Sequence, residues 1–290
     1  MKIKVPVLNA FVDGDAGGNP AGVVLAAQHY TQGQKQSIAA GVALSETAFV
    51  SPSSVADFKL EFFTPTRQIA HCGHATIAAF SYMKQLGLLK HDQTSKETID
   101  GRREIVMEGS YAFMEQLAPR YTELSQTDYF RMMASTGLAA SDILEGSQPC
   151  IVNTGNAFLV AALQNQEKVK SIVPINAEIA SISEIYDLIG FYIFSSQTMK
   201  KGRDAGTRMF APRYGIDEES ATGMAAGPLA CFLHDKLNIQ KDSFMIEQGY
   251  LMPEPSPSVI SVRLNKDNGA ISNLMAGGMA TVSEIKPIDF

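Results

Sequence analysis

A short motif that occurs twice constrains this sequence more than any other feature. In the first copy an apolar segment ends at Phe63-Thr64-Pro65, and a polar loop with His71-Cys72 leads to Gly73-His74 and an apolar helix. In the second copy Phe210-Ala211-Pro212 leads through an acidic loop to Ala221–Gly227 and another apolar helix. Each predicted helix begins with free backbone N–H groups and the positive end of its dipole. The repetition predicts two similar halves whose helix N-termini point at a shared cleft.

The two predicted helices are apolar on nearly all sides, which is typical of a helix enclosed by other elements. The first continues from His74 as Ala75, Ile77, Ala78 and Ala79. Strand–turn–strand patterns precede each motif copy, at residues 3–25 and again at 150–163. We therefore expect an α+β protein of two halves, each with one helix inside a sheet. Residues 119–125 are expected to form only a connector.

Composition excludes several classes of protein. The 290 residues carry a net charge of -6 and no Lys/Arg cluster longer than Lys200-Lys201 or Arg102-Arg103, which argues against nucleic-acid binding. The most apolar window, residues 182–194, is interrupted by Glu184 and Asp187 and is too short to span a bilayer. Three cysteines without metal-type spacing and a start without a signal-type apolar stretch fit a reducing compartment. We expect a soluble, cytoplasmic protein that binds no membrane.

Residue patterns alone leave the chemistry open. The pair His71 and His74 has no acidic neighbours in sequence, so no metal site is expected. Cys72 would have thiolate character if it were partly exposed, and is otherwise a structural cysteine. Over residues 43–50 a strand pattern would place Glu46 on the inner face, but the residue pattern alone favours a helix end there, which leaves Glu46 solvated. A desolvated Glu46 would have a raised pKa and could exchange a proton near neutral pH.

Four segments, in this order, resemble the PhzF family of phenazine-biosynthesis-type isomerases, whose fold is similar to that of diaminopimelate epimerase. The matching segments are Asn9–Phe11 with Gly17–Val24, Leu44–Phe49, Phe63–Pro65 with Cys72–Thr76, and Ala221–Gly223 followed by Ala225–Gly227. The resemblance implies two pseudo-symmetric domains, residues 1–118 and 119–290, each a barrel-like, mostly antiparallel sheet around a central helix. Whether the last strand returns to the first domain is left open. The active site between the domains, a homodimer and the absence of any cofactor or metal are also implied.

The resemblance assigns roles to individual positions. Glu46 takes the place of the carboxylate that transfers a proton, and His74 that of the histidine that contacts the substrate. Gly73 and Gly223 would each supply a backbone N–H to a substrate carboxylate, and Asn19 lies in the loop that would edge the cleft.

Three positions depart from the family pattern or from that of its epimerase relatives. Glu219 stands where the family has a catalytic aspartate, and Met224 stands where it has a serine, so one hydroxyl donor is lost. The epimerases use one thiol from each half, and here Cys72 holds the first position but Thr222 the second. A threonine hydroxyl is a poor base toward carbon, so a two-thiol racemisation is not expected.

We therefore expect a cofactor-independent isomerase in which Glu46 moves a proton within a small unsaturated carboxylic acid. Two alternatives stay open. One is a small-acid binding protein of the same fold that has lost catalysis, and the other is a racemase or epimerase that depends on Cys72.

Overall fold

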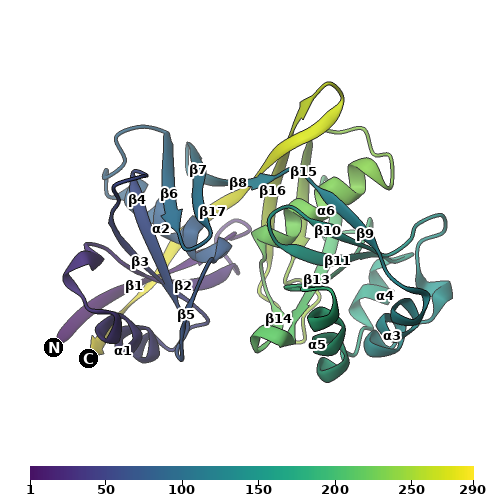
Figure 1. Cartoon of the computed structure of the whole chain (residues 1–290), viewed down its shortest axis with the longest axis horizontal. Coiled ribbons are helices and arrows are strands. Elements are labelled where there is room, and N and C mark those ends of the chain that lie inside the picture. Colours follow the sequence, from purple (N-terminus) through teal and green to yellow (C-terminus); the bar gives the residue numbers. More distant parts are fainter. The chain divides into compact units, whose positions relative to one another are not determined.

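The computed structural model describes residues 1–290, which fold into two compact units (Figure 1). Unit 1 comprises Met1–Glu115 and Gly277–Phe290, and unit 2 comprises Gln116–Ala276. The chain leaves unit 1 within strand β8 (Tyr111–Leu117) and returns to it within strand β17 (Ala270–Asp289). None of the helices has both the length and the apolar character needed to cross a membrane.

Unit 1 is a mixed sheet around one buried helix. Its elements before β8 are β1 (Lys2–Ala10), β2 (Asn19–Val24), η1 (Ala27–His29), α1 (Gln32–Val42), β3 (Thr47–Pro52), β4 (Phe58–Phe63), β5 (Gln68–Ile69), α2 (Gly73–Gln85), β6 (Gln93–Thr98) and β7 (Gly101–Glu108). Strand β1 pairs antiparallel with β2 and with the end of β17, and β2 runs parallel to β3. Strand β4 pairs antiparallel with β3 and parallel with β6, and the β6–β7–β8 hairpins follow.

Helix α2 lies among the strands of unit 1 (Figure 1) and is buried along almost its whole length. It contacts β1, β2 and β3. Small residues such as Ala75, Ala78 and Ala79 let strands approach the helix closely, and all three are fully buried. The enclosure predicted from the apolar sequence of this helix is confirmed.

Unit 2 repeats this topology. Its elements are β9 (Arg120–Glu123), α3 (Gln126–Thr136), η2 (Ala140–Asp142), β10 (Cys150–Asn153), β11 (Ala157–Ala162), α4 (Gln166–Lys170), α5 (Asn176–Ile185), β12 (Gly190–Ser195), β13 (Ala205–Ala211), η3 (Pro212–Tyr214), β14 (Ile216–Glu219), α6 (Gly223–Asp235), β15 (Ser243–Gln248) and β16 (Ser258–Asp267). Parallel pairs β11–β12 and β13–β15 correspond to β2–β3 and β4–β6. Helix α6 is the counterpart of α2, so the two-half α+β architecture is confirmed.

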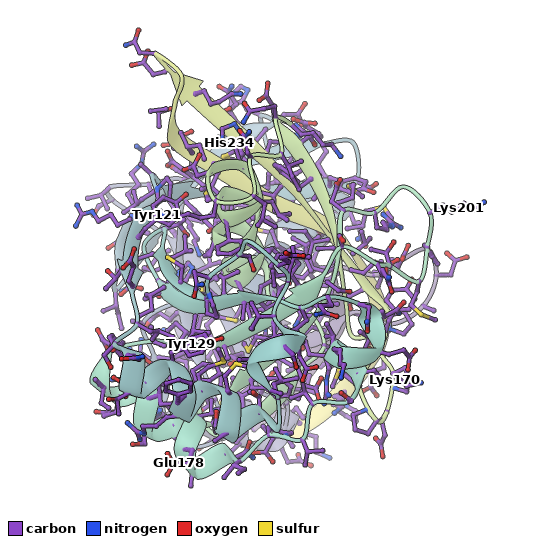
Figure 2. All side chains as sticks on the ribbon, turned by 90° about the vertical axis from the view of Figure 1, so that its right-hand side faces the viewer. Tyr121, Tyr129, Lys170, Glu178, Lys201 and His234 are labelled. Atoms are coloured by element: carbon purple, nitrogen blue, oxygen red, sulfur yellow. The ribbon has the colours of Figure 1, made fainter.

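Helices α3 and α5 cover one side of the unit 2 sheet. Figure 2 views unit 2 from a side that shows Tyr129 on α3 and Glu178 on α5. Arg131 of α3 contacts the Glu178 carboxylate at 3.1 Å, and Met132 and Ile179 are buried in the core beneath the helices. Helix α3 has no counterpart in the element order of unit 1, whereas α5 lies between β11 and β12 as α1 lies between β2 and β3.

Several expectations about local structure were wrong or incomplete. Residues 120–123 form β9, which pairs with β10, rather than a connector. Strands β6 and β15 were not predicted; the sequence of β6, Gln93–Thr98, is polar and shows no apolar alternation. Glu46 precedes β3 rather than lying within a strand over 43–50. The solvated reading of Glu46 was also wrong, because only 6% of the residue is exposed.

Candidate active site

The first motif copy folds into a turn that delivers its polar residues to the start of α2. Pro65 lies in a tight turn in which the Thr64 hydroxyl accepts hydrogen bonds from the backbone N–H of Thr66 and of Arg67. Strand β5 then pairs with β4 and brings the chain back to Cys72, which is the N-cap of α2. The first-turn amide groups of α2 therefore follow directly after the polar residues.

Glu46 and His74 form a buried pair in unit 1. The carboxylate Oε2 lies 3.2 Å from His74 Nε2, and the two side chains are 8% and 4% exposed. On the other side of the ring, His74 Nδ1 lies 3.2 Å from Asn19 Nδ2 and 3.6 Å from Cys72 Sγ. An amide nitrogen and a thiol both donate, so Nδ1 is an acceptor and the imidazole proton lies on Nε2, facing Glu46. The structure thus brings together four of the predicted site residues.

The pKa of Glu46 is lowered, not raised as the sequence reasoning expected for a desolvated carboxyl. Burial acts to raise this pKa, but the hydrogen bond and electrostatic attraction of His74 together outweigh it, and Ser45 adds a further hydrogen bond. Glu46 is therefore an ionised carboxylate at neutral pH. Such a group can accept a proton from a neighbouring molecule, with His74 as its hydrogen-bond partner.

Cys72 is too buried for the reactive thiolate considered from the sequence. Only 5% of it is exposed, and burial raises the pKa of its thiol, with the Glu46 charge adding to the effect against the opposing influence of His74. Glu46, Cys72 and His74 offer ligand atoms within 4.8 Å of one another, a grouping that sequence spacing did not reveal. However, Glu46 and Cys72 face opposite nitrogens of the His74 ring, and a ring nitrogen binds only one metal. The arrangement suits hydrogen bonding better than metal coordination.

Lys96 is a further buried group near this turn that the sequence reasoning missed. Its side chain is fully buried on β6, and its Nζ donates to Thr76 Oγ1 at 2.7 Å and lies 3.3 Å from His71 Nδ1. The ammonium also lies 5.2 Å from the centre of the Phe62 ring. Burial lowers the pKa of Lys96 to about 7, with Arg103 adding to the shift and Cys72 opposing it.

We predict that Lys96→Met raises the free energy of unfolding by about 2–4 kcal/mol near pH 7, because protonating a buried lysine costs free energy. The folded-state pKa lies below the unfolded value of 10.5, so between these values only the unfolded state keeps the proton. Wild-type stability should therefore rise from about pH 7 to about pH 10 and approach that of the variant. Urea denaturation followed by circular dichroism across this range measures both curves.

A matched control is Lys35, a buried lysine of unit 1 that forms an ion pair with the buried carboxylate of Glu61. Lys35→Met should destabilise the protein, because it leaves that carboxylate without its cation. A Lys96→Met variant that is as destabilised as Lys35→Met at neutral pH would contradict the prediction.

The second motif copy builds a separate polar cluster in unit 2. The Thr222 hydroxyl donates a short hydrogen bond to the Glu219 carboxylate. Gln248, which is fully buried, accepts from Thr222 N and from the Tyr192 hydroxyl, both at 2.9 Å. It donates to the Glu219 carbonyl at 2.6 Å and to Thr222 Oγ1 at 3.1 Å. Gln248 therefore fixes the loop before α6, a role that no sequence motif indicated.

The remaining predicted residues of unit 2 lie at the start of α6. The carbonyl of Gly223 accepts a hydrogen bond of 2.9 Å from Gln116, and Met224 is half-buried with its sulfur 3.6 Å from Asn156 Nδ2. The predicted site residues thus form two clusters, one in each unit. Their joint action on one substrate stays a prediction.

Comparison with known proteins identifies the relatives of this chain. A family model described as phenazine biosynthesis-like protein, PhzC-PhzF, matches residues 8–285. The chain is similar to the uncharacterized isomerase YfhB of Bacillus subtilis, with 27% identity over 274 residues that cover 92% of each chain. It is also similar to the trans-2,3-dihydro-3-hydroxyanthranilate isomerase of Pseudomonas chlororaphis, with 28% identity over 235 residues and 78% of each chain. The crystal structure of a Bacillus anthracis PhzF-family protein matches with a TM-score of 0.91 at 25% identity, covering 100% of both chains.

The two-half fold and these relatives define the class of the protein: it is an isomerase with the epimerase-like architecture expected from the sequence. More specifically, the chain belongs to the phenazine biosynthesis-like PhzF family. The resemblance noted in the sequence is confirmed.

Proposed function

We propose that the protein moves a proton between two carbon atoms of a small unsaturated carboxylic acid, with Glu46 as the group that carries it. One observation supports this most: the buried Glu46 carboxyl lies 3.2 Å from His74 Nε2, a contact that lowers the pKa of Glu46. The ring is fixed in turn by Asn19 at its other nitrogen. A carboxylate held by a positioned imidazole beside helix amide groups has the composition of a general acid–base site.

The proposed reaction has two steps. The Glu46 carboxylate first accepts a proton from a carbon next to the unsaturated system, and the electron pair of that C–H bond delocalises toward the substrate carboxyl group. The protonated Glu46 then returns the proton to a different carbon, so no atom is lost and nothing is oxidised. The backbone N–H of Gly73 would stabilise the negative charge that develops, and His74 would compensate each change in the charge of Glu46.

The substrate class is proposed from chemistry and from one relative. The Pseudomonas chlororaphis relative is named for an isomerisation of an unsaturated amino-hydroxy acid. In this chain the roles of Glu219, Thr222, Gly223 and Met224 rest on the motif resemblance. Because Glu219 and Met224 replace the aspartate and serine of the family, the substrate of that relative serves as a first probe and not as the assigned substrate. The homodimer and the cytoplasmic location stay predictions.

The test is incorporation of deuterium from heavy water. The protein is incubated with trans-2,3-dihydro-3-hydroxyanthranilate and with a panel of small unsaturated carboxylic acids, and carbon-bound deuterium is followed by NMR. Incorporation into at least one acid is expected. Binding of acids without incorporation into any of them would instead favour the alternative suggested by Glu219 and Met224, a small-acid binding protein that has lost catalysis.

Cys72 separates the proposed mechanism from a thiol-dependent racemase. We predict that Cys72→Ala keeps the incorporation rate within about threefold of wild type, because the buried, protonated thiol only donates to His74 and is not itself the base. Initial rates of deuterium incorporation check this. Complete loss of exchange in this variant, with full exchange in Glu46→Gln, would assign the chemistry to the thiol.

A further inference from the structure

Lys96 is buried without the compensation that buried charges usually have. Its amine contacts a hydroxyl, an imidazole nitrogen and the face of an aromatic ring, and it forms no ion pair with a carboxylate. Lys35, the other buried lysine of unit 1, is paired with Glu61. Burying an unpaired ammonium costs free energy of folding. A contribution to stability therefore does not account for a lysine at position 96.

The second half of the molecule shows that the fold does not require a lysine there. In unit 1 the parallel register sets Lys96 opposite Phe58, and in unit 2 the same register sets Ile246 opposite Ala205. Ile246 is fully buried and apolar. The partner of Lys96, Thr76, lies three residues after the first glycine of α2, where the matching residue of α6 is Ala226. One half thus has a polar pair where the other has an apolar one.

The polar pair is connected to the candidate active site by a continuous chain of hydrogen bonds. Lys96 Nζ donates to Thr76 Oγ1 at 2.7 Å, and this hydroxyl donates to the backbone carbonyl of Cys72 at 2.6 Å. Cys72 is the N-cap of α2, and its sulfur contacts His74. The pair therefore holds the turn Cys72–His74, which carries both the ring that faces Glu46 and the first free amide of the helix.

We propose that Lys96 is a positioning residue for the proton-transfer site: it fixes the Cys72–His74 turn through Thr76 and places a positive charge behind the amide groups that would receive the substrate carboxylate. The inference rests on the proposed function for its second part only. Its first part, the fixing of the turn, concerns the protein without substrate.

The charge of Lys96 depends on its surroundings. His71 and Cys72 face it from the turn, and Arg103 and Asp100 act on it from the neighbouring β6–β7 hairpin. The pKa of His71 is lowered well below its ordinary value by burial and by the charges of Lys96 and Arg103, so this ring is neutral. The pKa of Lys96 itself is lowered to about 7, so its protonated fraction falls across the neutral range.

Amide hydrogen exchange of the substrate-free protein tests the first part. In Lys96→Met and in Thr76→Val, exchange of the amides at residues 73–77, measured relative to those at residues 78–83 of the same helix, should be at least about fivefold faster than in wild type, because each variant breaks the same hydrogen-bond chain whereas a change in global stability acts on both segments. Thr76→Ser keeps the hydroxyl and should behave as wild type. In wild type the protection of residues 73–77 relative to residues 78–83, corrected for intrinsic rates, should fall by about threefold from pH 6 to pH 8.5, since the charged donor forms the stronger hydrogen bond. Lys96→Met should show no such decline.

Several results would overturn the inference: protection unchanged in both variants, an effect of Lys96→Met without one of Thr76→Val, or the same pH profile in Lys96→Met as in wild type. A lysine with a merely structural role would affect exchange without a matching effect of Thr76→Val, and the pH profile of Lys96→Met would equal that of wild type.

Kinetics test the second part of the proposal. The KM for an exchanging acid should rise about tenfold in Lys96→Met with kcat within about threefold. An unchanged KM would refute the role of the charge. Glu46→Gln should leave the amide exchange of residues 73–77 unaltered, so failure of the proposed chemistry can be told apart from failure of this inference.

Discussion

Replacing Glu46 by Gln is expected to slow deuterium incorporation by about 10²–10⁴-fold, the range typical for loss of a positioned general base. The amide of Gln has the shape of the carboxylate but cannot accept and return a proton at these pH values. His74 Nε2–H can still donate to the side-chain carbonyl oxygen, so the geometry of the pair is kept. Initial rates of incorporation by NMR measure the change.

Glu104→Gln is the matched control, because this glutamate lies on β7 of the same unit with 45% of its side chain exposed. Its exchange rate should equal that of wild type. Substrate binding gives a second readout, since Glu46→Gln should change affinity far less than rate. Equal rates in Glu46→Gln and wild type would refute Glu46 as the proton carrier, even if the fold and the family are as described.

The pH profile of the reaction adds to this argument. His74 lowers the folded-state pKa of Glu46 below its ordinary value of 4.5, so more than half of Glu46 is still ionised at pH 4.5. If Glu46 acts first as a base, titration of Glu46 should leave more than half of the neutral-pH exchange rate per folded molecule at pH 4.5. A carboxyl with the raised pKa expected from desolvation alone would give the opposite result, a rate that already falls near neutral pH.

The fold could be predicted from the sequence because its strongest features are local and repeated. The helical segment Ala75–Phe80 has no polar face that could be exposed to solvent, and its counterpart in residues 225–233 has the same property. Strand β6 could not be predicted in this way. Its residues Gln93–Thr98 contact groups such as Asp57 and Thr76 rather than a purely apolar core, so the strand lacks a hydrophobic period.

Residues of the candidate site could be predicted only at positions that match the motifs of the PhzF family. Residue patterns alone favoured a solvated Glu46, because its partner His74 is far along the chain and only the tertiary fold brings the two within 3.2 Å. Gln248 and Lys96 were missed for a related reason. A lone glutamine or lysine in a strand is normally solvent-exposed, whereas here each is buried against a distant partner, Thr76 for Lys96 and Thr222 for Gln248.

The buried side chain of Arg208 forms hydrogen bonds with two separate segments of unit 2. Its side chain is 4% exposed, and its Nε and Nη2 each lie 2.7 Å from an oxygen of Glu218, which forms a bidentate ion pair. Its Nη1 donates to the backbone carbonyl of Lys170, the last residue of α4, at 3.2 Å and to that of Ile172 at 2.8 Å. Figure 2 labels Lys170. One guanidinium thus connects β13, β14 and the C-terminus of α4.

Arg208→Met is therefore expected to lower the free energy of unfolding by about 3–5 kcal/mol, because it leaves a buried carboxylate unpaired and helix-end carbonyls without a donor. Arg208→Lys should recover little of this loss, since an ammonium cannot serve Glu218 in bidentate fashion and α4 at the same time. Differential scanning calorimetry and urea denaturation measure the effect.

The control lies in the same unit. Arg213 also contacts two carboxylates at 2.7 Å, but those of Glu184 and Asp187 are 71% and 88% exposed, so Arg213→Met should cost at most about 1 kcal/mol. The comparison isolates burial, because charge type and side-chain length are matched. A loss for Arg208→Met no larger than that for Arg213→Met would show that the buried pair contributes no more than an exposed one. A loss of the expected size would instead show that burial makes the Arg208–Glu218 pair, which lies next to Glu219 in sequence, contribute more to stability than the exposed pairs of Arg213.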